Sequence, residues 1–512
     1  MGSLELQSVS SKRGRKDAKP VAPQSLSEAV VIKIREGPDR QSQRIQSMSF
    51  AHICRVPEDL RKLKETAYTP RLVSIGPLHR KDEHLENSPM EDIKTSYATL
   101  LIYRATESKS EEEAMEILNE YKEEMTKSVD QAKTYYAGEA ALALNQEMLL
   151  VDACFILELL YRHDEKNEPS NALNNSPRVG GCFCCNKDRT RMHEGQQRCF
   201  NCFNKIFGSG RLAYRTVQRD LLLLENQIPF FVIKKLFELT EEKTRARQAR
   251  QDVFLINCVL SFFSDLLVTL PEANGDDNST PEIYHILHLL HTHYRPANLP
   301  KAESCYQFIQ SASDLECAGV KFESSNAKTQ SQSRNAKSPF QVKFDAPSGL
   351  KRWWFSRASF EIPTLHIDDS TELFLRNLMA FEQCCPSVSS YITSYAFIMG
   401  RLINTSKDVD VLQKAGIICN YLGSHKDASD LFNKLCSEIE NGDFHFAKAC
   451  RDAAEYSSRR WPQAVASLRR NNFNTPWAYI GFGVAFVLFL SALSGFVGNV
   501  LNYHCSGNRS SD

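Results

Sequence analysis

The chain has 512 residues, of which 42% are hydrophobic and 24% charged, ordinary usage for a globular protein with a sizeable core. Its 62 Lys and Arg balance its 62 Asp and Glu, so the overall charge gives no support for a nucleic-acid-binding protein. Several of the 16 cysteines lie inside apolar helical runs, for example Cys154, Cys258 and Cys419, which favours free thiols over a disulfide framework.

Residues 1–48 are predicted to form a disordered, basic N-terminal tail. They include Lys12, Arg13 and Lys16, and no aromatic residue precedes Phe50, so the tail lacks the side chains that a packed core requires. It has no apolar run long enough for a secretory signal. The basic run could bind an anionic surface, but solvated charge is the simpler interpretation.

Residues 49–470 are predicted to form one mostly α-helical globular domain with a few short strands. Apolar residues that recur at helical spacing are the main evidence. They predict helices over 142–161, 230–239 and 283–290, and the strongly apolar runs 220–227 and 253–270 are also predicted to be helices.

Strands and connections are predicted mainly in the second half of this domain. Apolar and polar residues alternate over 340–344 and again over 360–367, which predicts short strands. Asp369 with Glu372 predicts a capping box that opens a helix. The polar run over 325–338 is predicted to be a linker.

A cysteine-rich insert is predicted over 163–215. Cys182 and Cys184 form one pair, and Cys199 and Cys202 form a second, so four thiolates could surround a structural zinc ion. Cys185 or His193 could replace one of these ligands. The spacing matches no standard zinc knuckle. The alternative is therefore a surface loop with unligated thiols.

Two groups of polar residues invite a functional interpretation. His79, in a Gly-Pro-Leu-His turn, and Glu225 with Asn226 and Gln227 are candidates to line a pocket, although capping and buried hydrogen bonds are the simpler explanation. His285, His288 and His291 fan across one side of a predicted helix. Their spacing is poor for a metal, so a polar helix face is favoured.

The C-terminal region predicts a single transmembrane helix over 476–501. The run from Trp477 to Gly498 has no charged residue, Asn or Gln, and spans roughly 33 Å as a helix, enough to cross a bilayer. Arginines are frequent before it and rare in the short tail 502–512. The positive-inside rule then predicts a tail-anchored, single-pass protein of the plasma membrane or endomembranes, with its N-terminal bulk in the cytosol and the tail luminal or extracellular.

Small residues lie at helical spacing within this stretch. Ser491, Gly495 and Gly498 would let two such helices approach closely. This face predicts a homo-oligomer in addition to an unknown protein partner.

Motifs spread along the chain are typical of one plant family. They read VPEDLR at 56–61, VSIGPLH at 73–79, RDLLLLENQIPFF at 219–231, NLMAFEQ at 377–383 and NFNTPW at 472–477. In these motifs the chain resembles the plant family called domain of unknown function 247, or UPF0481. The resemblance implies a mostly helical protein with a C-terminal membrane helix and no known catalytic residues. Some grass members are implicated as pollen determinants of self-incompatibility, which implies recognition.

No established catalytic motif occurs in a credible context. Together with the resemblance, this predicts a membrane-anchored interaction or recognition protein without evident catalysis. One alternative is an enzyme with a pocket near His79 and Glu225. The other is an adaptor stabilised by zinc.

Overall fold

The chain divides into two units, Met1–Phe50 and Ala51–Asp512, and all residues described below belong to the second. The computed structural model describes residues 51–106, 110–167, 211–244, 251–264, 266, 282–296, 298–303, 309–325, 338, 340–346, 357–437, 443–458, 484 and 487–497.

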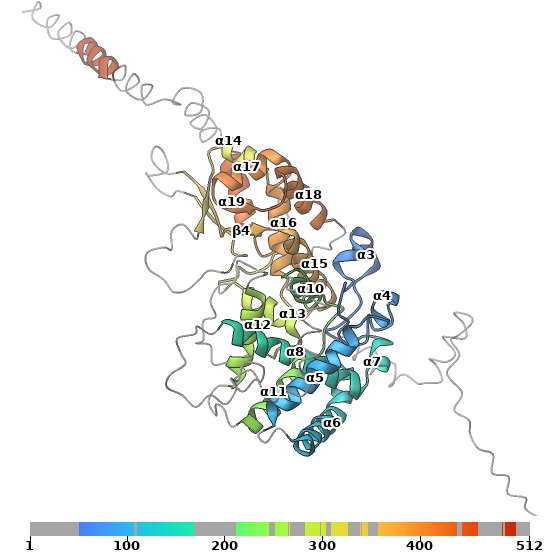
Figure 1. Cartoon of the computed structure of the whole chain (residues 1–512). Coiled ribbons are helices and arrows are strands. Elements are labelled where there is room, and N and C mark those ends of the chain that lie inside the picture. The colour runs from blue at the N-terminus through green and yellow to red at the C-terminus, as the bar shows by residue number, and fades with distance from the viewer. Residues whose placement is uncertain are drawn as a thin grey trace, which may run out of the picture. The chain divides into compact units, whose positions relative to one another are not determined.

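The first half of the second unit is a bundle of helices around α8 (Gln146–Asn167). All residues from Asp152 to Leu160 are buried, because neighbouring helices cover α8 on several sides. Figure 1 shows these neighbours, which are α5 (Met90–Ala105), α6 (Glu111–Lys133), α11 (Phe230–Thr244) and α12 (Gln251–Ser264).

The second half combines two small sheets with a further set of helices (Figure 1). These helices are α14 (Ala312–Cys317), α15 (Asp369–Cys384), α16 (Tyr391–Leu402), α17 (Ser406–Lys414), α18 (His425–Leu435) and α19 (Ala447–Ser457). The first sheet has β3 (Ser359–Ile362) in the centre, with β1 (Lys321–Ser324) parallel and β2 (Lys343–Asp345) antiparallel to it. The second pairs β4 (Leu365–Ile367) in parallel with β5 (Ile418–Asn420).

The chain also contains several shorter elements. They are α3 (Glu58–Leu63), the 3₁₀ helix η1 (Glu65–Ala67), α4 (Glu83–Glu86), α7 (Ala140–Ala143), α10 (Arg211–Asp220) and α13 (Ile286–Tyr294). Between η1 and α4, residues 71–79 run through the interior without helix or strand. This irregular segment contacts α5, α8, α10 and residues 225–226, and forms the candidate site described below.

The domain is mostly helical with few strands, as the sequence predicts, and most predicted helices are present. The predictions for 142–161, 230–239, 253–270 and 283–290 correspond to α8, α11, α12 and α13 with shifted ends. The predicted helix over 220–227 is wrong, since α10 ends at Asp220 and turns follow. Its four leucines are all buried, although the backbone is irregular. The prediction rested on apolar content without helical periodicity, and apolar content alone does not distinguish a helix from a buried turn.

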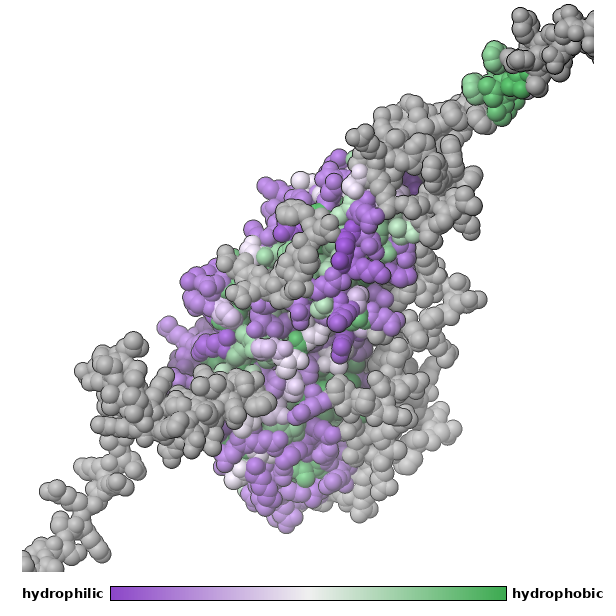
Figure 2. Space-filling model, turned by 180° about the vertical axis from the view of Figure 1, so that it is seen from behind, coloured by the Kyte–Doolittle hydropathy of each residue, from purple (hydrophilic) through white to green (hydrophobic). Residues whose placement is uncertain are grey.

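The predicted transmembrane helix over 476–501 requires correction. Within the parts of the chain that the structure describes, no helix is long and apolar enough to cross a membrane. The described helix in this stretch covers 484 and 487–497. Residues 487–497 span about 16 Å, roughly half of a hydrocarbon core. The apolar side chains of this helix are exposed (Figure 2). The finding contradicts the predicted span, the single-pass membrane localisation and the cytosolic orientation that depended on it.

Several other predictions fall wholly or mainly on residues outside those described. They concern the tail 1–48, most of the insert 163–215, most of the linker 325–338 and the tail 502–512. Ser491 and Gly495 lie on the helix over 487–497, whereas Gly498 lies beyond it. Homo-oligomer formation through these residues stays a prediction.

The N-terminus of α15 shows how a local sequence fixes a helix boundary. Asp368 is the N-cap, and its carboxylate accepts hydrogen bonds from the backbone N–H groups of Ser370 (2.8 Å) and Thr371 (3.0 Å). The Thr371 hydroxyl in turn accepts from the Asp368 N–H at 2.9 Å, which completes a capping box. The predicted box began one residue too late, at Asp369.

Replacing Asp368 with Ala removes this cap. We expect the free energy of unfolding to fall by about 1 kcal/mol, the usual cost of a lost N-cap. Asp369→Ala is the matched control, because Asp369 is exposed and caps nothing. Urea unfolding followed by circular dichroism measures both variants. Equal destabilisation by the two substitutions would contradict the assignment of Asp368 as the cap.

Candidate functional site

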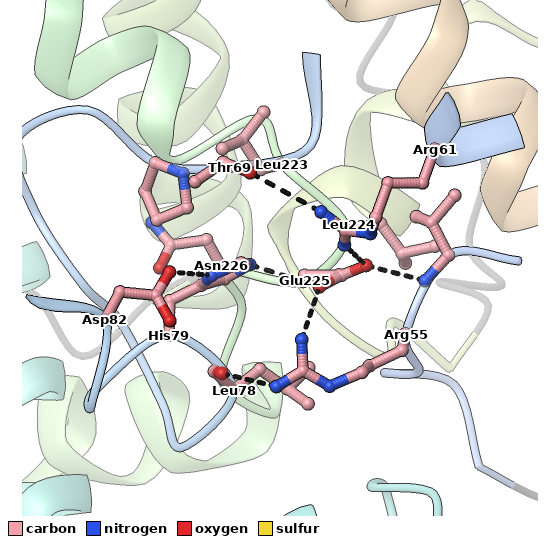
Figure 3. A network of polar contacts seen from close by, with 12 residues as sticks. Arg55, Arg61, Thr69, Leu78, His79, Asp82, Leu223, Leu224, Glu225 and Asn226 are labelled. Carbon is pink, nitrogen blue, oxygen red and sulfur yellow. Dashed lines mark hydrogen bonds and ion pairs between the residues drawn. The ribbon is translucent and has the colours of Figure 1, made fainter. Parts of the chain in front are cut away.

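The structure brings His79 and Glu225 together, as the pocket hypothesis requires. Glu225 follows α10, and its side chain is completely buried. His79 Nε2 lies 3.1 Å from Glu225 Oε2, and its other ring nitrogen, Nδ1, lies 2.6 Å from Asp82 Oδ2. Figure 3 shows the imidazole between these two carboxylates. Each ring nitrogen of His79 therefore faces one carboxylate oxygen.

The remaining contacts of Glu225 come from the segment that begins the domain (Figure 3). Its Oε1 accepts a 2.6 Å hydrogen bond from the Val56 N–H and forms an ion pair with Arg61. Arg55 approaches Oε2 at 3.4 Å and donates a 2.9 Å bond to the carbonyl of Leu78. Although burial acts to raise it, His79, the Val56 N–H and the Arg61 charge together lower the pKa of Glu225 below its usual value. Glu225 is therefore a buried carboxylate held ionised by protein groups.

Asp220, at the end of α10, holds the start of the 71–79 segment. Its carboxylate accepts three backbone hydrogen bonds, from Arg71 (2.9 Å), Leu72 (2.7 Å) and Val73 (2.9 Å). Burial raises the pKa of Asp220 to about 6, and the three hydrogen bonds act against that rise. An irregular chain that enters the interior needs such acceptors, because an unpaired buried N–H group is costly.

Asn226 continues the same function further along the segment. Its side-chain oxygen accepts from the Ile75 N–H at 2.7 Å, and its amide group donates to the carbonyls of Val73 and Asp220, both at 2.9 Å. The neighbouring Gln227 donates to two carbonyls of its own turn, at Leu221 and Leu223. These bonds explain why 221–227 forms a stable turn instead of a helix.

A buried ion pair in the helical bundle also holds the 71–79 segment. Asp152 of α8 accepts from the Gly76 N–H at 2.8 Å and pairs with Lys94 of α5 at 2.5 Å. Lys94 also donates to the carbonyl of Ser74 at 2.8 Å, and both charged side chains are fully buried. A charge pair in the interior is tolerated when hydrogen bonds satisfy both partners.

Gly76 is required by the geometry of this contact. Its φ angle is +69°, a left-handed conformation that favours glycine. A Cβ atom there would lie 2.7 Å from the Gln227 carbonyl oxygen and 2.9 Å from the Tyr136 hydroxyl. The 71–79 segment therefore packs against 221–227 at backbone distance.

Helix α15 joins the same network from the second half of the domain. Asn377 accepts a 2.9 Å hydrogen bond from the Leu224 N–H and donates a 2.8 Å bond to the Ala67 carbonyl. We call the six buried side chains that hold 51–79 and 221–227 the polar anchor. It consists of Asp152, Asp220, Glu225, Asn226, Gln227 and Asn377.

Sequence reasoning identified only part of the polar anchor. Asp152 and Asn377 were missed, and Asp220 was noted only as the start of a predicted helix. One signal was available: Asp152 is a lone acid within an apolar helical run, and a buried charge must have a partner. The identity of that partner, Lys94, depends on helix packing and cannot be read from the sequence.

The histidines of α13 do not form the polar surface face that their spacing predicts. His285 is the N-cap of the helix, and its side chain accepts from the His288 N–H at 3.2 Å. All three rings are buried against Phe381, and His291 Nε2 lies 2.8 Å from Glu382 Oε1. Burial lowers the pKa of His288 to about 3, with smaller effects from His291 and His52.

The predicted zinc ligands cannot be placed. Cys182, Cys184, Cys199 and Cys202 lie outside the described residues. Among the residues that are described, no group of three or more His, Cys, Asp or Glu could hold a metal ion. The structural zinc site stays a prediction.

Comparison with known proteins identifies the family. The family described as "plant protein of unknown function", DUF247, matches residues 53–491. The chain belongs to this family. All six residues of the polar anchor lie within the matched region.

Two relatives of the DUF247 chain come from Arabidopsis thaliana. The UPF0481 protein At3g47200 is 25% identical over 484 residues, which cover 88% of this chain and 86% of the relative. The putative UPF0481 protein At3g02645 is 27% identical over 186 residues, or 36% of this chain and 31% of the relative. No solved structure matches the chain.

Replacing Asp220 with Asn tests the polar anchor. The amide offers one acceptor oxygen where the carboxylate offers two, so at least one buried N–H group loses its partner. We expect the free energy of unfolding to fall by about 2–3 kcal/mol. Asp59→Asn serves as the control, because the Asp59 side chain is 79% exposed. Chemical denaturation at pH 7 measures the difference, and a stability equal to that of the control would contradict the role of Asp220.

The buried histidines predict a loss of stability in acid. Unfolded His288 binds a proton near pH 6.5, whereas the folded residue does so only near pH 3. Its contribution is therefore complete above pH 6.5 and falls by roughly 3 kcal/mol between pH 6.5 and pH 4. His288→Gln should reduce this dependence by a comparable amount, measured as the free energy of unfolding across that range. His366→Gln, in the middle of β4, is the matched control.

Proposed function

We propose that this chain is a protein-binding protein in which the polar anchor stabilises the fold of the binding domain and performs no catalysis. The observation that carries the proposal is the internal use of the anchor: its carboxylates and amides are engaged with backbone groups and ion-pair partners of the same chain. The motifs typical of the family, VSIGPLH and RDLLLLENQIPFF, provide both sides of these contacts. Their polar residues thus have a structural explanation.

The same contacts weigh against an enzyme centred on His79 and Glu225. A catalytic group has to reach a substrate atom within hydrogen-bond distance. Glu225 has no exposed side-chain surface, and the His79 side chain is only 3% exposed. Val56, Arg61 and His79 already surround the Glu225 carboxylate. A substrate could approach it only after the segment around Val56 had moved away.

The buried side chains that hold the irregular backbone also make the domain rigid. Residues 51–79 are fixed to α8, to the 221–227 turn and to α15, so the two halves of the domain are joined by hydrogen bonds and by packing. Partners that recognise folded surfaces need little rearrangement when the surface is rigid. The outer face in Figure 2 is largely hydrophilic over the described helices, which favours a polar interface.

Replacing Glu225 with Gln separates the structural from the catalytic role. If Glu225 is an anchor, the substitution should lower the midpoint of thermal unfolding by several degrees, because Arg61 and Arg55 lose their partner. Hydrogen exchange at Val56 and its neighbours should rise. Glu58→Gln, an exposed substitution on α3, should change neither quantity. A Glu225→Gln protein as stable as the wild type would favour the enzyme, since catalytic residues often contribute little to stability.

Binding is tested with the intact chain. Cross-linked affinity capture from plant tissue should give the same enriched protein with wild type and with Glu58→Gln, and less of it with Glu225→Gln. A thermal-shift screen with a metabolite collection is the complementary measurement. Stabilisation of the wild type by a small molecule, lost in Glu225→Gln, together with no enriched protein would overturn the proposal.

A further inference from the structure

Four partly exposed aromatic rings from distant parts of the sequence lie in a row. Phe231 of α11 lies 5.5 Å from Tyr135, measured between ring centroids, and Tyr135 lies 5.9 Å from His52. His52 in turn stacks on Tyr284 at 3.4 Å. We call these four residues the aromatic row. Each of them keeps part of its surface exposed, so each is accessible to a partner.

Hydrogen bonds to the main chain hold the supports of the aromatic row together. The His52 N–H donates to the Tyr135 carbonyl at 3.0 Å, and the Phe230 N–H donates to the Tyr284 carbonyl at 2.8 Å. The His285 imidazole, at the N-cap of α13, donates through Nε2 to the His52 carbonyl at 3.2 Å. Because these bonds connect the backbone beneath neighbouring rings, the row is ordered before a partner arrives, which lowers the entropy cost of binding.

The polar atoms of the aromatic row include several hydrogen-bond donors. Burial lowers the pKa of His52 to about 4, so its imidazole is neutral at pH 7 and carries one N–H donor. Within the described part of the chain, neither ring nitrogen of His52 contacts a hydrogen-bond acceptor. Tyr135 and Tyr284 add two hydroxyl groups. These groups suit a ligand that offers carbonyl oxygens.

The charge available beside the aromatic row is negative. Glu282 is exposed, accepts a 3.4 Å hydrogen bond from the Tyr135 hydroxyl and forms no ion pair with a described cation. Lys235, whose ammonium lies 5.8 Å from the Phe231 ring centroid, is already paired with Glu124 at 2.6 Å. A cationic ligand would complement Glu282. A symmetric dimer through the row would instead place two Glu282 carboxylates in one interface, which like-charge repulsion disfavours.

We propose that the aromatic row binds a proline-rich segment of a partner protein, and that Glu282 pairs with a basic residue of that segment. The inference rests on the protein-binding function proposed above and deepens it by naming the surface and the chemistry of the partner.

A proline-rich segment matches the aromatic row in two respects. Its polyproline II backbone is extended and already ordered, and aromatic surfaces bind such segments through the apolar proline rings. Proline also has no N–H group, so the carbonyl oxygens of the segment need donors from the other partner. The His52 imidazole and the tyrosine hydroxyls can provide them.

Fluorescence anisotropy with the intact chain tests this surface. The probe is a fluorescein-labelled polyproline peptide of about ten residues that ends in arginine. One control peptide has glycine in place of proline and so lacks the ordered backbone, and a second ends in glutamine instead of arginine. We expect the probe to bind at least about tenfold more tightly than the glycine peptide.

Three variants complete the test. Tyr284→Ala should weaken binding of the probe about tenfold, since a few aromatic residues contribute most of the affinity of an interface. Glu282→Gln should weaken binding of the probe about threefold and leave the glutamine-ended peptide unchanged. Tyr421→Ala, at an exposed aromatic residue just after β5, is the matched control and should bind as the wild type does. Because Glu282 is exposed, its variant decides the question even if Tyr284→Ala fails to fold.

The surface is overturned if the wild type does not bind the probe, or if Tyr284→Ala and Glu282→Gln bind it as tightly as the wild type. It is also overturned if sedimentation shows a wild-type dimer that Tyr284→Ala abolishes, because a second copy would then occupy the row. Affinity capture from plant tissue distinguishes this failure from that of the binding function. A protein enriched equally by wild type and Tyr284→Ala overturns the surface alone, whereas the absence of both an enriched protein and peptide binding overturns both proposals.

Discussion

Everything in this domain depends on satisfying the backbone of residues 71–79. These residues enter the interior without the hydrogen bonds that a helix or sheet would provide, and a buried N–H group without an acceptor costs about 1–3 kcal/mol. Asp220, Asn226 and Asp152 provide those acceptors, at distances of 2.7 to 2.9 Å. These acceptors come from α8, from the end of α10 and from the 221–227 turn, so one segment holds all three together.

The requirement also explains why family motifs far apart in sequence lie together. VSIGPLH contributes the irregular segment, RDLLLLENQIPFF contributes the acceptors, and VPEDLR contributes the cationic partner of Glu225. Each motif is polar at positions where an ordinary core would be apolar. A sequence pattern of this kind resembles an active site, since both consist of polar residues in apolar surroundings. The contacts of each polar atom distinguish the two possibilities.

Sequence patterns were sufficient for the helices whose apolar residues repeat regularly, such as α8 and α11. They failed at 221–227, where four leucines suggested a helix but side-chain amides hold a turn. The pairing of His79 with Glu225 was anticipated as a candidate site, although its neighbours were not. Asp152, Lys94 and Asn377 could not be assigned, because their partners are 20 to 310 residues away and are chosen by packing. Local periodicity carries no information at that range.

The sequence separation within the polar anchor has a consequence for synthesis on the ribosome. Arg71 leaves the peptidyl transferase centre 149 residues before Asp220, an interval of roughly 7 to 30 s at ordinary elongation rates. Ala67 is made 310 residues before Asn377, whose amide donates to the Ala67 carbonyl. During that interval the amides of Arg71, Leu72 and Val73 lack the Asp220 carboxylate that accepts from them in the folded chain, so they must stay solvated or be held by a chaperone. The beginning of this domain is therefore among the first parts made and among the last to acquire its final contacts.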